Sequence, residues 1–229
     1  SNEKLPLAVT VNWQDLAWPI ANTQDTLSSA ANAGFNSPIG HISLTGNLQQ
    51  LVLAIETKVL GKGLPDTQFE LTGKANLFDS NKHLVINNIL VQTLGGEINS
   101  QGELLLNDNL SWRGLTQLDS IKLTELMPNY PAELNGELNL NVQNKQGVWQ
   151  GDIDKLAIQG SWLGYPLSAA GKVDYHQING LNVEQFLFTN GDNKIELSGT
   201  LDQQNSLDFS FDLNAPHLAQ SVPELDGSI

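Results

Sequence analysis

The chain has 229 residues, 11 of them basic and 25 acidic, so its formal net charge is −14. This charge repels nucleic-acid phosphates and anionic membrane surfaces, so we expect neither nucleic-acid binding nor docking through a polybasic patch. Cysteine is absent, which excludes disulfides, thiol catalysis and cysteine-ligated metals.

Period-two alternation of apolar and polar residues runs through most of the chain and predicts β-strands. In Leu7–Trp13, the first example, the apolar residues at alternate positions share one face. The same pattern predicts strands at Ile42–Leu48, Phe69–Leu77, Leu84–Val91, Ile98–Leu106, Leu134–Val142, Leu156–Ile158, Leu167–Val173, Leu181–Phe188, Ile195–Leu201 and Leu207–Leu213. These segments are short and bounded by Gly, Asn, Asp or Pro, which predicts an antiparallel meander with one apolar face.

Glycine recurs at the end of an alternating pattern inside several of these strands. Clear examples end at Gly46, Gly73 and Gly199, and looser ones end at Gly102, Gly136, Gly160 and Gly171. A glycine within a strand typically marks a bulge or a bend. Repeated across neighbouring strands, such bends would curve the sheet into a trough. The alternative is that each glycine simply ends a strand.

Two kinds of segment interrupt the strands. Ala21–Pro38 is rich in small polar residues and predicts a long loop, whereas Ile121–Pro128 predicts a short helical turn that Pro128 stops. A related stretch returns at Leu218–Gly227, and the two prolines lie 95 residues apart, which predicts a long supersecondary repeat. We expect one continuous β-rich segment over residues 1–229, with a repeat boundary near 128–131. The start at Ser1 and the end at Ile229 suggest a piece of a longer protein.

The sequence contains no recognisable catalytic or metal-binding motif. The histidines, which have no ligand-like spacing, are His41, His83, His176 and His217. We interpret the carboxylates at Asp152, Asp154, Asp202, Asp208 and Asp212 as solvated surface groups. Acidic residues at alternate positions are common on the polar face of a strand and do not by themselves indicate a catalytic pair. No nucleophile-elbow or phosphate-binding motif is present. We therefore predict a protein that is not an enzyme and has no cofactor or metal.

The tryptophans leave two alternatives open. They are Trp13, Trp18, Trp112, Trp149 and Trp162, at or near predicted strand ends. They could stack against sugars or fill the ends of a core, and core packing is the commoner use.

Several motifs, taken in order, resemble the TamB family. Trp13-Gln14-Asp15-Leu16-Ala17-Trp18-Pro19 is similar to a W-x-D-L-x-W-P signature in the later part of TamB proteins. A long loop, a strand ending in Gly46 and a further strand over Leu48–Val59 follow, as in the family. The turn Gly63-Leu64-Pro65-Asp66 and the element Thr93-Leu94-Gly95-Gly96 also resemble TamB elements.

This resemblance implies an inner-membrane-anchored protein that spans the periplasm and works with an outer-membrane partner, TamA, through regions outside this chain. It also implies roles in outer-membrane protein assembly and phospholipid movement, and an all-β, elongated, curved, mostly antiparallel sheet forming an open trough, or β-taco, with an apolar interior. We expect phospholipid acyl chains, outer-membrane protein substrates or both as ligands.

The first hypothesis is a hydrophobic lipid conduit, because large exposed apolar surfaces mark binding sites. Its expected lining is Leu44, Leu53, Ile55, Leu71, Ile86, Leu140, Ile158, Leu197, Phe209 and Phe211. A one-residue slip in register would turn these residues to the other face, and they could also fill an ordinary sandwich core. A second hypothesis is chaperone-like capture of unfolded outer-membrane strands by β-augmentation. A third, a carbohydrate-binding or hydrolysing β protein, lacks the expected cluster of acids and Trp.

Overall fold

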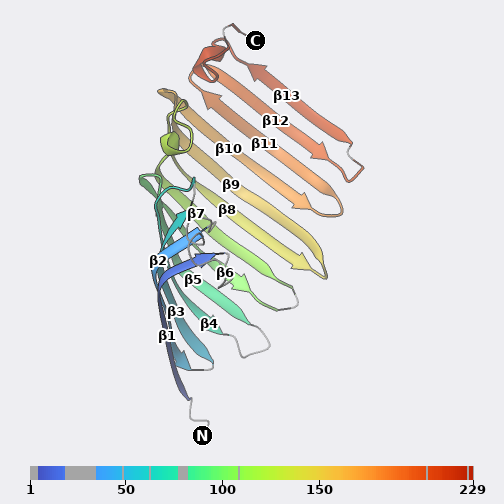
Figure 1. The fold of residues 1–229 in the computed structure, drawn as a ribbon. Coiled ribbons are helices and arrows are strands. Elements are labelled where there is room, and N and C mark those ends of the chain that lie inside the picture. Colours follow the sequence, from blue (N-terminus) through green and yellow to red (C-terminus); the bar gives the residue numbers. More distant parts are fainter. Residues whose placement is uncertain are drawn as a thin grey trace, which may run out of the picture.

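The computed structural model describes residues 5–18, 35–47, 49–61, 63–76, 82–107, 109–204, 206–225 and 227–228. The described strands form one antiparallel sheet of 13 strands, in which each strand pairs with its neighbours in sequence (Figure 1). The strands are β1 (Pro6–Trp18), β2 (Phe35–Asn47), β3 (Gln50–Gly61), β4 (Thr67–Asn76), β5 (His83–Thr93), β6 (Gly96–Leu105), β7 (Ser111–Lys122), β8 (Ala132–Lys145), β9 (Val148–Trp162), β10 (Tyr165–His176), β11 (Gly180–Asn190), β12 (Asn193–Leu201) and β13 (Leu207–Asn214). The predicted all-β class is confirmed.

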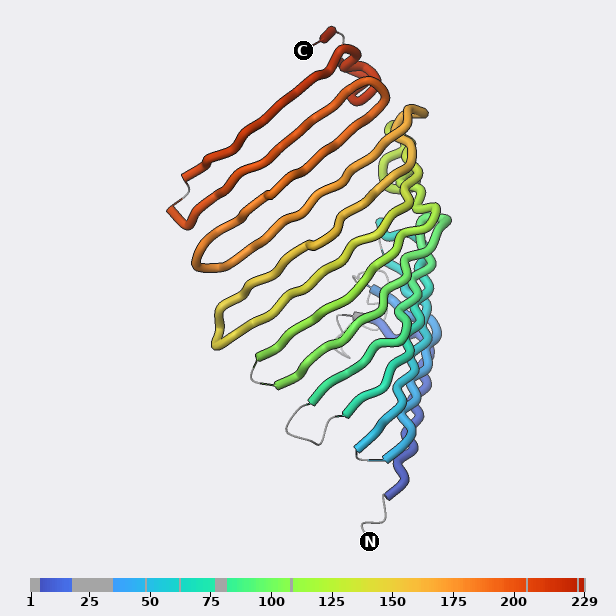
Figure 2. Tube along the Cα trace, turned by 180° about the vertical axis from the view of Figure 1, so that it is seen from behind, coloured from blue at the N-terminus to red at the C-terminus, as the bar shows by residue number. Residues whose placement is uncertain are grey.

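The sheet is open and strongly curved. In Figure 1, β8–β13 present a broad face, whereas β1–β7 are seen crowded and nearly edge-on, and Figure 2 shows the same change of direction from behind. The first and last strands do not pair with each other, so the sheet forms a trough and not a closed barrel. This agrees with the predicted elongated, curved trough.

Bulges formed by two consecutive polar residues curve the strands. The register shifts at Asn87–Asn88, Asp119–Ser120, Asp154–Lys155 and Glu184–Gln185, and each pair lies between two apolar residues. A bulge bends its strand and increases the local twist. Because the two residues of a bulge oppose a single residue of the neighbouring strand, the apolar side chains just before and just after the bulge project from the same face.

Glycines of adjacent strands lie beside these bulges. Gly73 and Gly102 both pair with Ile86, next to the bulge in β5, and Gly199 pairs with Val183, next to the bulge in β11. A Cβ added at Gly102 would lie 2.4 Å from the Arg113 carbonyl oxygen, so the strands can approach only without a side chain there. These glycines lie inside strands, as the curvature hypothesis requires.

Several sequence-based boundaries were incomplete. The pattern missed β3, β7 and the first half of β9, and most strands extend beyond the predicted ends. The resemblance alone had placed a strand over Leu48–Val59, where β3 lies. Phe35–Pro38, assigned to the loop beginning at Ala21, belongs to β2, while residues 21–34 lie outside the described part. Of the predicted turn over Ile121–Pro128, only η1 (Leu123–Glu125) is helical, because Ile121 and Lys122 still pair with β8.

The two Leu-to-Pro segments adopt the same turn. In η1, the amides of Leu126 and Met127 both donate to the Leu123 carbonyl oxygen, at 3.0 and 2.8 Å. In η2 (Leu218–Gln220), the amides of Ser221 and Val222 donate to the Leu218 carbonyl oxygen, at 3.0 and 2.9 Å. η1 follows β7 and η2 follows β13, so the six strands β8–β13 lie between the two turns. Pairing of β7 with β8 keeps the sheet continuous across residues 128–131. Where a domain boundary lies stays a prediction.

Candidate functional site

One face of the sheet carries four apolar ladders that cross all thirteen strands. We call a row of directly paired residues a ladder, and paired residues project from the same face of a sheet.

The first ladder is Leu7, Gly46, Leu51, Ala75, Leu84, Leu104, Trp112, Val142, Gly151, Tyr175, Leu181, Leu201 and Leu207. The second is Val9, Leu44, Leu53, Gly73, Ile86, Gly102, Gly114, Leu140, Ile153, Val173, Val183, Gly199 and Phe209. The third is Val11, Ile42, Ile55, Leu71, Ile89, Ser100, Thr116, Leu138, Leu156, Gly171, Phe186, Leu197 and Phe211. The fourth is Trp13, Gly40, Thr57, Phe69, Val91, Ile98, Leu118, Gly136, Ile158, Ala169, Phe188, Ile195 and Leu213.

None of these four ladders contains Asp, Glu, Lys, Arg or His. A ladder on the opposite face shows the contrast: it reads Asn12, His41, Glu56, Glu70, Leu90, Asn99, Gln117, Glu137, Ala157, Ala170, Leu187, Glu196 and Asp212. The sheet is therefore amphipathic. We call the face that bears the four ladders the trough face, and the opposite face, which carries the charged side chains, the charged face.

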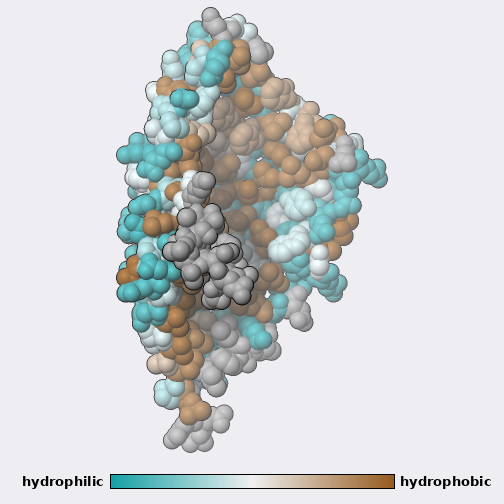
Figure 3. Space-filling model, viewed as in Figure 1, coloured by the Kyte–Doolittle hydropathy of each residue, from teal (hydrophilic) through white to brown (hydrophobic). Residues whose placement is uncertain are grey.

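No second sheet covers the trough face in the described part of the chain. Only strands adjacent in sequence pack extensively together. The described residues include few buried apolar side chains, among them Leu51, Ile86 and Val183, whereas Phe211 remains 58% exposed. Figure 3 shows hydrophobic residues gathered over the hollowed surface of the sheet. The sandwich core considered from the sequence is therefore not formed.

All ten residues proposed from the sequence as groove-lining lie on the trough face. Leu44, Leu53, Ile86, Leu140 and Phe209 belong to the second ladder. Ile55, Leu71, Leu197 and Phe211 belong to the third, and Ile158 to the fourth. The register brings them onto one surface, and whether that surface binds lipid stays a prediction.

Polar groups on the trough face of β1–β7 are paired with one another. Trp13 Nε1 donates to Ser37 Oγ at 2.7 Å, and that oxygen lies 2.7 Å from Thr57 Oγ1. Ser100 and Thr116 hydroxyls lie 2.8 Å apart. Because hydrogen bonding offsets the cost of placing hydroxyls on an apolar surface, these groups do not interrupt it as unpaired ones would.

Two tryptophans fill spaces left by glycines. A Cβ at Gly40 would lie 1.9 Å from Trp13 Cζ2, and one at Gly114 would lie 2.3 Å from Trp112 Cζ2. The Trp13 ring therefore lies over a glycine of the adjacent strand β2, and the Trp112 ring lies over a glycine of its own strand β7. Both contacts indicate that these two tryptophans are used for packing. The side chain of Trp18 lies outside the described part.

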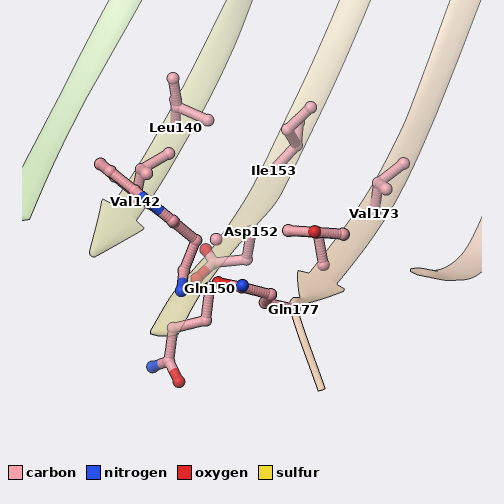
Figure 4. A pocket seen from close by; sticks show the side chains of 10 residues that line it. Leu140, Val142, Gln150, Asp152, Ile153, Val173 and Gln177 are labelled. Carbon is pink, nitrogen blue, oxygen red and sulfur yellow. Dashed lines mark hydrogen bonds between the residues drawn. The ribbon is translucent and has the colours of Figure 1, made fainter. Parts of the chain in front are cut away.

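A hollow of about 560 Å³ opens where β8, β9 and β10 meet the turn edge, which we define as the edge formed by turns 145–148, 176–180 and 201–207. Its apolar lining includes Leu140, Val142, Ile153 and Val173 (Figure 4). Trp149 and Tyr175 also line it. The sequence did not single out this place, because Gly151 interrupts the alternation of apolar residues between Trp149 and Ile153.

Asp152 adjoins this hollow from the charged face. It is paired directly with Asp174, and Asn141 Nδ2 donates to its carboxylate at 3.0 Å. Burial raises the pKa of Asp152, and the nearby Asp154 carboxylate raises it further. Like charges opposite each other in a sheet are unfavourable, so this pair is a local cost to stability.

Other candidate chemistry is sparse in the described residues. They contain no group of three His, Asp or Glu residues placed to hold a metal ion. Nor does any helix among them have the length and hydrophobicity needed to cross a bilayer.

The family model described as "TamB, N-terminal domain" matches residues 1–229. The chain is 25% identical, over 230 residues, to the Translocation and assembly module subunit TamB of Haemophilus influenzae, an alignment that covers 100% of this chain and 17% of that protein. The chain thus spans well under two thirds of the relative's length. The motif around Trp13 had suggested the later part of TamB, whereas the matching model is named for the N-terminal domain. No solved structure matches. Because the family model covers every residue, the chain belongs to the TamB family.

Proposed function

We propose that this chain is a non-catalytic periplasmic segment of an envelope protein whose trough carries phospholipid acyl chains between the inner and outer membranes and supports outer-membrane protein assembly. The observation that carries the proposal is the trough face, on which four ladders cross thirteen strands without a charged side chain. The proposed module includes a TamA-like outer-membrane partner, reached through regions outside this chain. The relative's name, a subunit of a translocation and assembly module, supports membership of such a module.

An acyl chain suits the trough face better than a peptide does. Backbone donors and acceptors of the central strands are already paired with adjacent strands. A peptide lying on that face would therefore lose water from its own N–H and C=O groups without gaining protein partners, which is costly. An acyl chain has no such groups and gains roughly 0.8 kcal/mol for each CH₂ that it buries.

The uniformity of the ladders favours movement over storage. Affinity spread along all thirteen strands, without a charged interruption, gives a bound chain similar neighbours at successive positions. A path for transfer needs this property, because one deep site would hold the lipid in place.

Photocrosslinking in cells tests the proposal. A photoreactive amino acid is placed at Leu44, Leu197 or Phe209 on the trough face. The matched controls are the adjacent residues Ser43, Glu196 and Asp208 on the charged face. We expect phospholipid adducts at the first set and not at the second. Equal labelling of both sets, or none at either, would overturn the proposal.

Strand capture is the second candidate, and the edges of the sheet favour it over the trough face. Within the described residues, β1 and β13 each pair with only one strand. A free strand edge offers unpaired backbone groups to an unfolded outer-membrane strand. Crosslinks from β1 or β13 to outer-membrane proteins, lost on proline substitution in the same strand while lipid adducts persist, would support it.

A further inference from the structure

The hollow at the turn edge combines an apolar floor with two amphipathic aromatic residues. Leu140, Ile153 and Val173 are consecutive members of the second ladder, and the hollow opens beside them (Figure 4). Its volume of about 560 Å³ lies within the usual range of small-molecule sites. The hollow is therefore large enough to hold part of an amphiphile, and it is continuous with the trough face.

Glycine keeps the space between the two aromatic residues open. Gly151 lies in the first ladder between Val142 and Tyr175, and Trp149 comes two residues before it on the same strand. A Cβ at Gly151 would lie 3.1 Å from Val142 Cγ2, in the direction of the hollow's lining. Trp149 and Tyr175 remain 43% and 47% exposed, respectively, so both rings are accessible.

The polar tips of these rings have no hydrogen-bond partner within the part of the chain that the structure describes. No described residue accepts a hydrogen bond from Trp149 Nε1 or from the Tyr175 hydroxyl, whereas Trp162 Nε1 donates to the Ser221 carbonyl oxygen at 2.9 Å. Trp and Tyr are suited to positions where one end of the ring is apolar and the other polar, as at the headgroup level of a membrane. Unused N–H and O–H donors beside an apolar floor match the ester carbonyls of a glycerolipid.

A hydrogen-bonded frame fixes this part of the turn edge. Gln177 Oε1 accepts a hydrogen bond from the backbone N–H of Trp149 at 2.8 Å. The backbone N–H of Gln177 donates to the Trp149 carbonyl oxygen, also at 2.8 Å. Gln203 Nε2 donates to the Gln177 carbonyl oxygen, which ties the turn before β13 to the same place. The aromatic residues are thus held on a fixed support and not on a free loop.

From this geometry we infer that Trp149 and Tyr175 bind the glycerol-ester region of a diacyl phospholipid, with its acyl chains on the second ladder and its headgroup beyond the turn edge. The inference rests on the proposed function and adds an orientation to it: the headgroup leaves the trough over turns 145–148 and 176–180. The net charge of −14 disfavours an anionic headgroup, so a zwitterionic phospholipid is the probe.

Fluorescence quenching measures this orientation, and the absence of cysteine allows single labels. One label replaces Ile178, which is exposed in the turn 176–180, and the other replaces Leu167 near the opposite end of β10. The chain binds phosphatidylcholine carrying a nitroxide either on the headgroup or at the end of one acyl chain. We expect the headgroup nitroxide to quench the Ile178 label at least ~3-fold more than the Leu167 label, because a β-strand extends roughly 3.3 Å per residue.

The outcomes separate this inference from the proposed function. No quenching of either label by either lipid would overturn both. Strong quenching by the chain-end nitroxide, with equal headgroup quenching of the two labels, would overturn the orientation and leave the lipid-carrying trough in place.

Removing the two hydrogen-bond donors, Trp149 Nε1–H and the Tyr175 hydroxyl, provides a second test of the inference. Trp149→Phe combined with Tyr175→Phe keeps an aromatic ring at each position and removes the N–H and O–H groups. We expect lipid affinity to fall about fivefold for each hydrogen bond lost and the headgroup preference for the Ile178 label to disappear. Tyr165→Phe, an exposed tyrosine at the other edge, is the control and should change neither. Unchanged affinity and orientation in the double variant, with an unchanged melting temperature, would overturn the inference.

Discussion

At the scale of single residues, the curvature of the sheet depends on glycines that lie beside polar bulges. Gly102→Ala would place a Cβ 2.4 Å from the Arg113 carbonyl oxygen, and backbone cannot move away as a flexible side chain can. We expect a loss of about 1–3 kcal/mol in the free energy of unfolding, as for other overpacked positions. Chemical denaturation measures it.

Gly171→Ala is the matched control for this substitution. Its nearest contacts would be at 3.0 Å, and one of them is the movable ring of Phe186. We expect a change within about 1 kcal/mol, since the lower entropy of the unfolded alanine chain offsets part of the crowding. Equal losses at both positions would show that close strand approach does not set the requirement for glycine.

Asp152 provides a second residue-scale prediction, which concerns pH. Burial and the neighbouring Asp154 raise the pKa of Asp152 in the folded chain above its unfolded value, so the charged carboxylate opposes folding at neutral pH. This penalty is lost as the pH falls through the folded pKa toward 3.8, where the carboxyl is protonated. Asp152→Asn should therefore raise the melting temperature at pH 7 and have little effect near pH 3. Asp208→Asn, exposed on β13, is the control, and an equal gain from it would contradict the argument.

At the scale of elements, the η2 segment is held against the sheet by a buried polar cluster. Asn190 is 0% exposed, and Ser221 Oγ donates to its side-chain oxygen at 2.9 Å. Asn193 Nδ2 donates to the His217 carbonyl oxygen and to Ser221 Oγ, each at 2.8 Å. The segment therefore joins the turns of β9–β12 at the edge opposite the turn edge.

Asn190→Ala should release this segment. It removes the acceptor of the half-buried Ser221 hydroxyl, and the loss of such a hydrogen bond typically costs about 1 kcal/mol. We expect faster hydrogen exchange in residues 215–225 and little change in β2–β6. Asn179→Ala, in an exposed turn, should leave exchange in residues 215–225 unaltered. Uniformly faster exchange across the whole sheet would instead indicate global destabilisation.

The success of sequence prediction also varied by element. β12 was found almost to its ends because Ile195, Leu197 and Gly199 alternate cleanly on the trough face. β7 was missed because Gly114 and Thr116 occupy trough positions, which leaves Trp112, Leu115 and Leu118 at a spacing of three. Neither the bulges nor the hollow could be predicted, since both depend on register between strands, which alternation within one strand does not specify.

The sequence left open which face of each strand points inward, although charged residues mark the opposite face in several strands. Glu196 and Asp208 flank Leu197 and Phe209, so only one choice keeps carboxylates off an apolar surface. The hollow at Trp149 and Tyr175 carried no such marker, since Gly151 takes the place of an apolar residue between Trp149 and Ile153.

At the scale of the whole molecule, a conduit and a storage site respond differently to a single charge. If lipid moves along the ladders, a carboxylate anywhere across the path must be passed, and desolvating it against an acyl chain is costly. Leu53→Glu in β3 and Leu140→Glu in β8 should therefore each reduce transfer between membranes at least ~10-fold in the complete protein, although the two positions lie on strands far apart in the sheet. The controls are Ala54→Glu and Asn139→Glu, which project from the charged face and should transfer at the unsubstituted rate. Exchange of labelled phospholipid between donor and acceptor vesicles is the measurement. If only one of the two trough substitutions blocks transfer, the trough contains a local lipid site and not a continuous path.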